Sequence, residues 1–311
     1  MILCIGTTPA AQRVMAFRKL TIDAVNRAVT TLDGMAGKSV NVAKVLQALG
    51  EQPVAVGFLG GDRGEQLRAL LEERGIELEF VRVAPRTRQC ITLLDTSAGT
   101  HTEVVEESQP VAAADYEELM HVIRRRVKGC RAVVMSGTIT PGGPTDLYLH
   151  GTQMAHETGA IPVVDAQGAA LLEALKAKPA LVKPNRPELA ATLGRELKDE
   201  AALMSAMREL SERGAQRVVV TAGKDPALAF DGQSWWRVRA PRIEAMNPIG
   251  SGDAFTAGLV WRLLRGDNFG EACRWASATG AANALTMMAG EVNRDDVERL
   301  AAETRVEELR D

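Results

Sequence analysis

The chain has 311 residues, of which 46% are hydrophobic, and its formal net charge is −3. This length is enough to bury a sizeable core in one large α/β domain or two smaller ones. The near-neutral charge argues against a nucleic-acid-binding or membrane-surface protein, because those usually carry a strong basic excess, but it leaves room for an anionic small molecule bound by local cations.

The N-terminus reads MILCIGTTPA, an apolar run that is too short for a signal peptide and has no basic leader. No window approaches the length of a membrane span. The four cysteines lie far apart without CxxC spacing, which favours reduced thiols in the core. These features predict a cytoplasmic protein.

Short apolar runs that predict buried strands alternate with helical patterns along the chain. The strand VAVGFLG at 54–60 is followed by a helical pattern that stops at Gly75. Further Val-rich strands are predicted within 131–137, 161–168, 180–185 and 217–223, and further helices within 144–159 and 199–214. This alternation predicts an α/β fold with a parallel sheet and helices on both faces.

Polar residues follow three of these strands. Asp165, Asn185 and Thr221 each stand at the C-terminal end of a predicted strand. Ligands of open parallel sheets bind beyond that edge, so we expect these side chains near a site.

Two regions depart from the alternation. Residues 14–33 and 87–105 read as short alternating strands, and Ser97 to Gly99 marks a hairpin turn between two of them. We expect these strands to form a small β-sheet flap on the α/β core.

Two stretches resemble anion-binding motifs without matching them. In GMAGKSVN at 34–41, Leu32 stands where a P-loop needs glycine, so we reject a Walker A loop. A Gly-rich turn that caps the next helix and a functional role both stay open for this stretch. We interpret IRRRVK at 123–128 as the solvated end of a helix, where positive charge is favoured.

The stretch NPIGSGDAF at 247–255 places one acid at a helix start. Phe255, Leu259 and Leu263 form an apolar track that ends near Gly266, so Asp253 lies in the first helical turn. The backbone N–H groups of the GSGD tetrad lack intrahelical partners and, with the helix dipole, form an anion site. That tetrad is Gly250, Ser251, Gly252 and Asp253.

This arrangement suits phosphoryl transfer. Preset N–H donors stabilise the charge on the transferred group, and Asp253 accepts the proton of an attacking hydroxyl. The helix dipole is expected to keep Asp253 ionised near neutral pH. On the tetrad alone, an ordinary helix capped by Asp253 or Ser251 is an equal alternative.

With this stretch at 247–255, the sequence resembles the PfkB, or ribokinase-like, family of carbohydrate kinases. NPIGSGDAFTAGLV at 247–260 fits the C-terminal signature of that family, and AGKSVNVAKVLQALG at 36–50 fits the N-terminal one, with Ser39 in place of the usual glycine. Further matches are GFLGGDRGEQL, TRQC, SGTITPGG, VVDAQG, LVKPNRPEL and VVVTAGKD.

The resemblance spans nearly the whole chain and is strongest with the phosphosugar branch, which comprises 1-phosphofructokinases, tagatose-6-phosphate kinases and minor 6-phosphofructokinases. It implies a single three-layer sandwich over 1–311 with a mostly parallel central sheet. It also implies a small β-sheet lid inserted at roughly 12–35 and 85–107.

The resemblance further implies ATP, Mg²⁺ and a ketohexose phosphate acceptor. Asp253 would be the base, and Gly250, Ser251 and Gly252 would form the anion hole. Asn185 and Glu188 match an NxxE motif that holds magnesium. Lys183, Thr221 and Gly223 would contact the nucleotide phosphates, and Asn283 is expected near the adenine.

On the acceptor side the resemblance implies that Gly37, Lys38 and Asn41 contact the sugar. Lys38 and Arg88 are candidates for the substrate's own phosphate, because a bound dianion needs cations. The hydroxyl groups of Ser136 and Thr138 could bond the same phosphate.

One departure concerns the sugar. Phosphosugar kinases of this branch typically read NPALD after the first strand, and the aspartate holds sugar hydroxyls. Here the run is TTPAAQR, with Gln12 in place of the acid. A neutral amide donates as well as accepts, so the identity of the sugar stays open.

We therefore expect an ATP-dependent kinase of fructose 1-phosphate, fructose 6-phosphate or tagatose 6-phosphate, forming a homodimer through the lid. One alternative is a related kinase of an unphosphorylated sugar, sugar acid or nucleoside. The other is a non-catalytic regulator that binds a nucleotide or a sugar phosphate.

Overall fold

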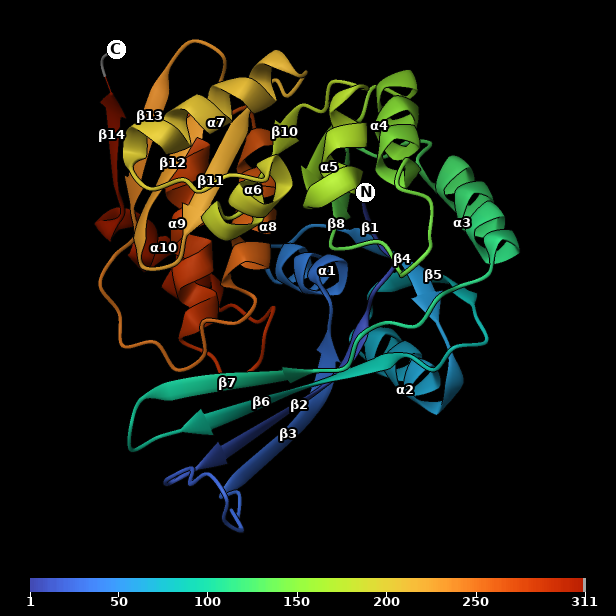
Figure 1. Ribbon diagram of the computed structural model, residues 1–311, viewed down its shortest axis with the longest axis vertical. Helices are drawn as coiled ribbons and strands as arrows, with labels where there is room; N and C mark the ends of the chain where they lie inside the picture. The colour runs from blue at the N-terminus through green and yellow to red at the C-terminus, as the bar shows by residue number, and fades with distance from the viewer. Residues whose placement is uncertain (310–311) are drawn as a thin grey trace.

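One large sheet of ten strands organises the computed structural model, which describes residues 1–309 (Figure 1). The strand order is β14-β13-β12-β11-β10-β9-β8-β1-β4-β5, parallel from β5 to β11 and antiparallel from β11 to β14. The strands are β1 (Ile2–Gly6), β4 (Pro53–Leu59), β5 (Glu77–Arg82), β8 (Ala132–Ser136), β9 (Ile161–Asp165), β10 (Leu181–Val182), β11 (Val218–Ala222), β12 (Asp225–Phe230), β13 (Trp235–Arg239) and β14 (Arg305–Leu309).

Helices cover both faces of this sheet, because successive strand residues point to opposite sides. Cys4 of β1 packs into one apolar core, whereas its neighbours Leu3 and Ile5 pack into the other. The first core is covered by α1 (Lys38–Ala48), α2 (Gly61–Glu73), α8 (Ser251–Leu263), α9 (Phe269–Ala284) and α10 (Arg294–Glu303). The second is covered by α3 (Ala113–Arg126), α4 (Leu147–Glu157), α5 (Gly168–Leu175), α6 (Arg186–Leu193) and α7 (Glu200–Glu212). The predicted three-layer α/β fold is confirmed.

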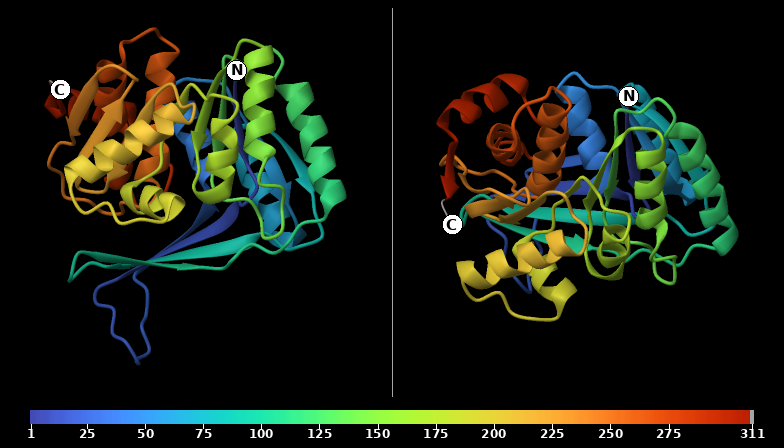
Figure 2. Two further views of the ribbon diagram at one scale, coloured as in Figure 1. Left: turned by 45° about the horizontal axis from the view of Figure 1, so that its top comes forward. Right: turned by 90° about the horizontal axis from the view of Figure 1, so that it is seen from above.

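A separate four-stranded sheet, which we call the lid sheet, lies beside the core (Figures 1 and 2). Its order is β3-β2-β6-β7, built from β2 (Ala10–Phe17), β3 (Thr30–Ala36), β6 (Arg88–Asp95) and β7 (Thr100–Val105). β2 begins earlier than the sequence pattern suggested, directly after Pro9, whereas β6 and β7 lie within the predicted range 87–105. The connection 18–29 contains no strand, and it projects away from the core in Figure 2.

The lid sheet has an inner face that rests on the core. Val14, Ala16 and Leu94 form a small apolar cluster there, packed against Met287 and Met288, which follow α9. Strand alternation puts Gln12 on the same face as Val14. The lid therefore directs Gln12 towards the C-terminal edge of the large sheet.

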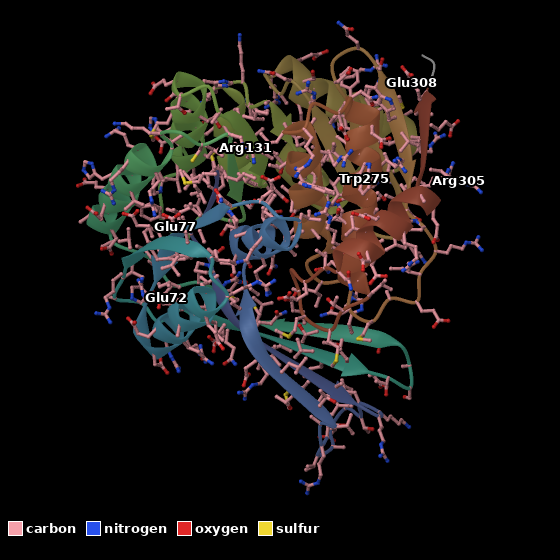
Figure 3. All side chains as sticks on the ribbon, turned by 180° about the vertical axis from the view of Figure 1, so that it is seen from behind. Glu72, Glu77, Arg131, Trp275, Arg305 and Glu308 are labelled. Atoms are coloured by element: carbon pink, nitrogen blue, oxygen red, sulfur yellow. The ribbon has the colours of Figure 1, made fainter. Side chains whose placement is uncertain are left out.

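The two edges of the large sheet are visible from behind in Figure 3, where Glu77 marks β5 and Arg305 and Glu308 mark β14. All four cysteines are free and buried, as predicted. Within residues 1–309 no helix has both the length and the apolar character needed to cross a bilayer.

Candidate active site

Two helix N-termini meet the C-terminal edge of the parallel strands. Helix α1 begins at Lys38 after Gly37, and α8 begins at Ser251 after Gly250. β9 ends at Asp165, and Lys183 directly follows β10. Because the positive ends of both helices point to one edge, this part of the molecule is suited to an anion.

The turn before α8 contains the residues predicted to form the anion hole, and we use that name for it below. Gly250 has a φ of 85°, and a Cβ atom there would lie 2.9 Å from the Ala289 Cβ. The N–H groups of Gly250, Gly252 and Asp253 have no backbone partner within residues 1–309. The expectation for Ser251 was wrong, because its N–H closes a turn by donating to the Pro248 carbonyl at 3.1 Å.

Asp253 lies in the first turn of α8, and it is 7% exposed. Its Oδ2 accepts a hydrogen bond of 2.7 Å from Asn41 Nδ2. Burial raises the pKa of Asp253 to about 7, with Asp165 adding to the rise and Lys38 opposing it. A pKa of about 7 leaves the carboxyl group only partly ionised at neutral pH, in contrast to the expectation from the sequence, because burial outweighs the opposing effects of Lys38, Asn41 and Lys183.

Asp165 holds the centre of the site together, a role that the sequence reasoning missed although it placed this residue at a strand end. Its carboxylate lies 3.0 Å from Lys38 Nζ and 3.0 Å from Lys183 Nζ, and it accepts a 2.7 Å hydrogen bond from Thr256. Burial alone would raise the pKa of Asp165, but Lys183 and Lys38 lower it to about 2. Asp165 is therefore a permanent anion at neutral pH.

Lys38 differs most from its expected place. It was predicted to meet the acceptor, but its ammonium bridges Asp165 and Glu188, with a distance of 2.8 Å to Glu188 Oε1. Burial alone would lower the pKa of Lys38, yet Asp165, Glu188 and Asp253 together raise it. Lys38 thus remains a cation and lies between the carboxylates of Asp165 and Glu188.

The NxxE pair begins α6. Asn185 Oδ1 accepts from the Glu188 N–H, and Glu188 Oε2 accepts from the Asn185 N–H, both at 2.8 Å. This is a capping box, which fixes the carboxylate at the sheet edge. Thr221 forms a parallel bridge with Asn185, and Gly223 follows in a turn with a φ of 64°.

The oxygen donors at this edge suit magnesium, which is usually held by one or two carboxylates together with water and phosphate. The Lys38 ammonium group occupies the point between Glu188 and Asp165, and both oxygens of Asp165 already have partners in Lys38, Lys183 and Thr256. Glu188, which is the more exposed of the two, is therefore the carboxylate that an ion could reach. The described residues contain no cluster of three or more His, Cys, Asp or Glu that could hold a metal unaided. The donor set therefore fits an ion that a nucleotide helps to hold.

Lys183 and Asn283 flank the anion hole in different ways. Lys183 Nζ lies 3.7 Å from the place that a Cβ on Gly252 would occupy, which is within reach of a bound phosphate. Asn283 is fully buried, donates to the Ile249 carbonyl at 2.9 Å and accepts from the Gly290 N–H at 2.8 Å. Asn283 thus braces the turn before α8 instead of lying at a surface open to adenine.

Several buried polar atoms of β2, α1 and β8 have no hydrogen-bond partner within residues 1–309. These are both amide atoms of Gln12, Oδ1 of Asn41 and Oγ of Ser136. An unpaired buried group costs about 1–3 kcal/mol, so such groups are usually satisfied by a ligand or water. Thr138 is exposed nearby, and its carbonyl accepts from the Thr7 hydroxyl.

Arg88 lies at the start of β6, and its guanidinium donates to the Thr8 carbonyl at 3.2 and 3.1 Å. It lines a cavity of about 30 Å³ together with Arg86. Hydroxyl groups complete the polar wall, from Thr7, Thr8, Thr87, Ser108 and Thr140. Arginines and hydroxyls around one space suit a phosphate, and only Arg88 among these residues was predicted from the sequence.

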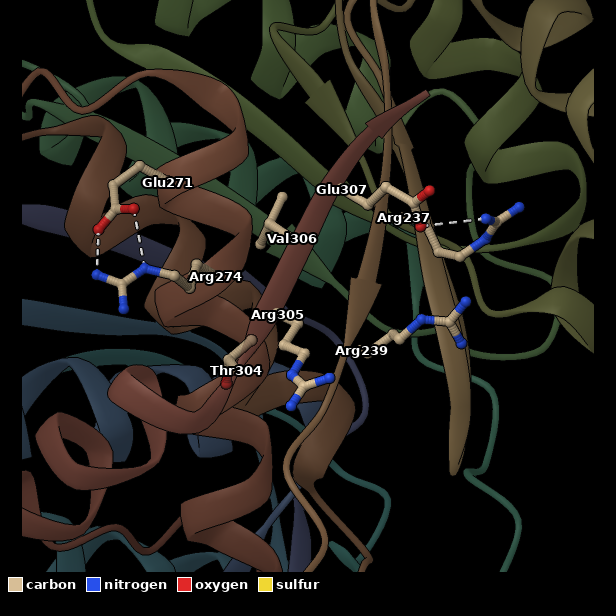
Figure 4. A pocket seen from close by; sticks show the side chains of 8 residues that line it. All are labelled: Arg237, Arg239, Glu271, Arg274, Thr304, Arg305, Val306 and Glu307. Atoms are coloured by element: carbon tan, nitrogen blue, oxygen red, sulfur yellow. Dashed lines mark hydrogen bonds and ion pairs between the residues drawn. The ribbon is translucent and has the colours of Figure 1, made fainter. Parts of the chain in front are cut away.

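A larger pocket of about 690 Å³ lies elsewhere, around the edge strand β14 (Figure 4). Four arginines line it, but Arg274 pairs with Glu271 and Arg237 with Glu307. None of the residues predicted for catalysis or binding lines this pocket. The polar side chains around Asp165, Lys38 and Asp253, at the C-terminal edge of the parallel strands, therefore form the candidate active site.

Comparisons with known proteins identify the family of this chain. The family model described as "pfkB family carbohydrate kinase" matches residues 1–295. A tagatose-6-phosphate kinase from Staphylococcus epidermidis is 30% identical over 312 residues, covering 99% of this chain and all of that protein.

Solved structures match over almost the full length. Phosphofructokinase-2 from Escherichia coli in complex with fructose-6-phosphate is 25% identical, with a TM-score of 0.85 and 97% of each chain covered. A tetrameric inhibited form of that enzyme, also 25% identical, has a TM-score of 0.86 with 97% and 98% coverage. A Thermotoga maritima structure named "Possible 1-phosphofructokinase" has a TM-score of 0.91 over 99% of each chain, and at 24% identity it shows the shared fold alone.

Proposed function

Because this chain belongs to the PfkB family of carbohydrate kinases, we propose that it transfers the γ-phosphoryl group of ATP to a hydroxyl of a ketohexose phosphate. The observation that carries this proposal is the position of Asp253. Its carboxylate lies in the first turn of α8, held by Asn41 and next to the free N–H groups of the anion hole.

In the proposed reaction Asp253 takes the proton of the acceptor hydroxyl. The hydroxyl oxygen then bonds to the γ-phosphorus, and the bond to the bridging oxygen breaks, so that ADP leaves with the electron pair. The N–H groups of Gly250 and Gly252 stabilise the charge on the transferred group, with Lys183 beside them. A base with a pKa near 7 is well matched to this proton transfer.

Magnesium, when bound, would neutralise charge on the nucleotide phosphates. Asn185 and Glu188 are the residues that would hold it, directly or through water, and the capping box keeps Glu188 at the sheet edge. Lys38 bridges Asp165 and Glu188, and because its side chain is about one-third exposed, an incoming phosphate would compete with these carboxylates for its ammonium group.

We propose that the acceptor carries a phosphate next to Arg88. Arg86 of this cavity is paired with Asp62, so Arg88 is the cation that would meet the phosphate, together with the hydroxyl groups that line the cavity. Gln12, Asn41 and Ser136 would bind the sugar hydroxyls, because their buried polar atoms lack partners. Fructose 1-phosphate, fructose 6-phosphate and tagatose 6-phosphate are the proposed acceptors.

One observation favours a second candidate acceptor class. Gln12 is neutral, so the site offers a donor and an acceptor where relatives of this branch carry an acid. A kinase of an unphosphorylated sugar, sugar acid or nucleoside would need no cation at Arg88. The two candidates therefore differ in what Arg88 contributes.

The test measures ADP release with a panel of phosphorylated and unphosphorylated acceptors, for the wild type and for Arg88→Ala. The variant should raise KM for the sugar phosphate about 10- to 100-fold, as expected for lost charged hydrogen bonds, with KM for ATP unchanged. The matched control is Arg13→Ala, since Arg13 pairs with Asp33 on the outer side of the lid. An unchanged acceptor KM would favour the second candidate, and ligand stabilisation without any turnover would indicate a binding protein.

We also propose a homodimer formed through the lid. Apolar side chains on the lid sheet and its 18–29 connection point to solvent, including Ile22 at 87% and Val25 at 83% exposure. Such a patch is typical of an interaction surface. The four free cysteines suit a reducing compartment, so we propose that the reaction takes place in the cytoplasm.

A further inference from the structure

Lys44 is a buried cation that the proposed chemistry does not use. It lies on α1, is 1% exposed, and stands one helical turn after Asn41. Its Nζ donates to the Ala289 carbonyl at 2.6 Å and to the Met35 carbonyl at 3.2 Å, and lies 3.1 Å from Glu291 Oε1. All three donors of the ammonium group therefore have partners.

The first of these partners lies directly behind the anion hole. A Cβ on Gly250 would lie 2.9 Å from both the Ala289 Cβ and the Gly290 nitrogen. A Cβ on Gly290 would in turn lie 2.8 Å from the Asn41 Cα. The Ala289–Gly290 peptide therefore packs so closely against Gly250 and Asn41 that neither Gly250 nor Gly290 could carry a side chain.

The second partner belongs to the lid. Met35 is the next-to-last residue of β3, where the lid sheet joins α1. The residues just before Ala289 also contact the lid, because Met287 and Met288 pack against its inner apolar cluster. Met288 presses on β3 so closely that a Cβ on Gly34 would lie 2.4 Å from its terminal methyl.

The third partner fixes this junction to the core. Glu291 also binds Arg74 through two hydrogen bonds of 2.7 and 2.9 Å, and Arg74 caps the end of α2. Residues 286–291, which we call the coupling segment, thus contact the lid at one end and the anion hole at the other. Lys44 joins the coupling segment to the root of the lid.

We propose that Lys44 is a positioning residue that links the position of the lid to the geometry of the anion hole. Its ammonium group holds the Met35 and Ala289 carbonyls together, so a movement of the lid over an acceptor is transmitted to Gly250. This inference rests on the proposed kinase reaction, since transfer of a phosphoryl group to an acceptor requires both the lid and the anion hole. It predicts that loss of Lys44 separates ATP cleavage from acceptor phosphorylation.

The test compares Lys44→Met, which keeps an unbranched side chain of similar length but has no donors, with Lys44→Arg, which keeps the charge. Lys44→Met should lower kcat about 10- to 100-fold, because small misplacements of reacting groups have effects of that size, while the KM for ATP stays within about twofold. It should also release more ADP per phosphorylated acceptor than the wild type. Lys44→Arg should restore most of kcat and the wild-type product ratio.

The matched control is Arg74→Met, which removes the outer partner of Glu291 and leaves both carbonyl contacts of Lys44 in place. If Lys44 were only structural, the two Met variants would lose stability and activity in parallel, with the product ratio unchanged, and the proposal would be overturned. If Lys44→Met does not fold, Lys44→Gln replaces it, with the same expected loss of coupling.

A second measurement does not depend on turnover. Amide hydrogen exchange of peptides covering 286–291 and 247–253 should become faster in Lys44→Met and stay at the wild-type rate in Arg74→Met. Unchanged exchange in Lys44→Met would overturn the positioning role. A wild type that phosphorylates no acceptor would refute the proposed function instead, and the exchange data alone would then decide whether Lys44 holds the segment.

Discussion

Replacing Asp253 by Asn should abolish most of the activity and at the same time stabilise the protein at alkaline pH. The substitution removes the proposed base and keeps the shape of the side chain. Asn41 can still donate its hydrogen bond, because the new amide also presents an oxygen. General base catalysis typically contributes 10²–10⁴-fold, so kcat should fall by about that factor while ATP affinity changes little.

The gain in stability follows from the pKa of Asp253. That pKa rises from an ordinary value of 3.8 to about 7 on folding, chiefly because the carboxyl group is buried. Between these values the folded chain holds a proton that the unfolded chain has lost, so the stability of the wild type falls as pH rises. Above pH 7 the full cost of the buried charge is present, on the order of 4 kcal/mol at about 1.4 kcal/mol per pKa unit.

The variant has no buried charge at this position, but it has a buried amide donor. The new amide N–H₂ group has to find an acceptor in the cleft, and an unpaired buried donor costs about 1–3 kcal/mol. We therefore expect Asp253→Asn to be about 1–3 kcal/mol more stable than the wild type at pH 8. The gain should shrink as pH falls through 7 and reverse towards pH 4, where the wild type buries no charge and the variant still has its unpaired donor.

Urea unfolding at pH 8 and pH 5 measures this difference, and ADP release at pH 8 measures turnover. Circular dichroism of the folded variant serves as the control for structure. A variant that is less stable than the wild type at both pH values would refute the electrostatic reasoning. Near-normal turnover would refute the assignment of Asp253 as base.

Three further outcomes are expected. In the wild type, kcat/KM should rise with pH along a limb with a midpoint near 7, since Asp253 acts only when ionised; a flat profile from pH 5.5 to 8.5 would contradict this. Asp165→Asn should destabilise the fold by about 3–5 kcal/mol in urea unfolding, because it leaves two lysines without their buried counter-charge, whereas Thr256→Val should cost about 1 kcal/mol. The double variant Ile22→Asp and Val25→Asp should halve the mass measured by sedimentation, and a mass equal to that of the wild type would exclude the lid as the interface.

The sequence could predict the layers of the fold because the signals are local. Val-rich runs followed by helical patterns indicate a parallel sheet, and the start of α8 is marked by glycines before an apolar track. The pairing of Lys38 could not be predicted in this way. Its partners Asp165 and Glu188 are 127 and 150 residues away, so a basic residue in a Gly-rich turn could equally have faced a phosphate.

Contacts that the local sequence does not specify also explain the unexpected roles of Ser251 and Asn283. Whether a backbone N–H at a helix start is free depends on the turn before it, and the Pro248 carbonyl takes the one on Ser251. Asn283 is buried because α9 packs along α8, which turns its amide towards Ile249 and Gly290. Such contacts depend on tertiary packing, which no periodicity records.

The raised pKa of Asp253 is consistent with its proposed role as the base. Lys38 and Lys183 form their ion pairs with Asp165 and Glu188, and Asp253 has no ion pair of its own. Burial therefore outweighs the opposing effects of Lys38, Asn41 and Lys183, and it brings the pKa of Asp253 to about 7. A carboxylate with a pKa of 3.8 would always be ionised but would bind a proton weakly, whereas one near 7 is a stronger base and is still half ionised at neutral pH. The packing that lowers the stability of the fold at this position is thus the same packing that suits Asp253 to accept a proton.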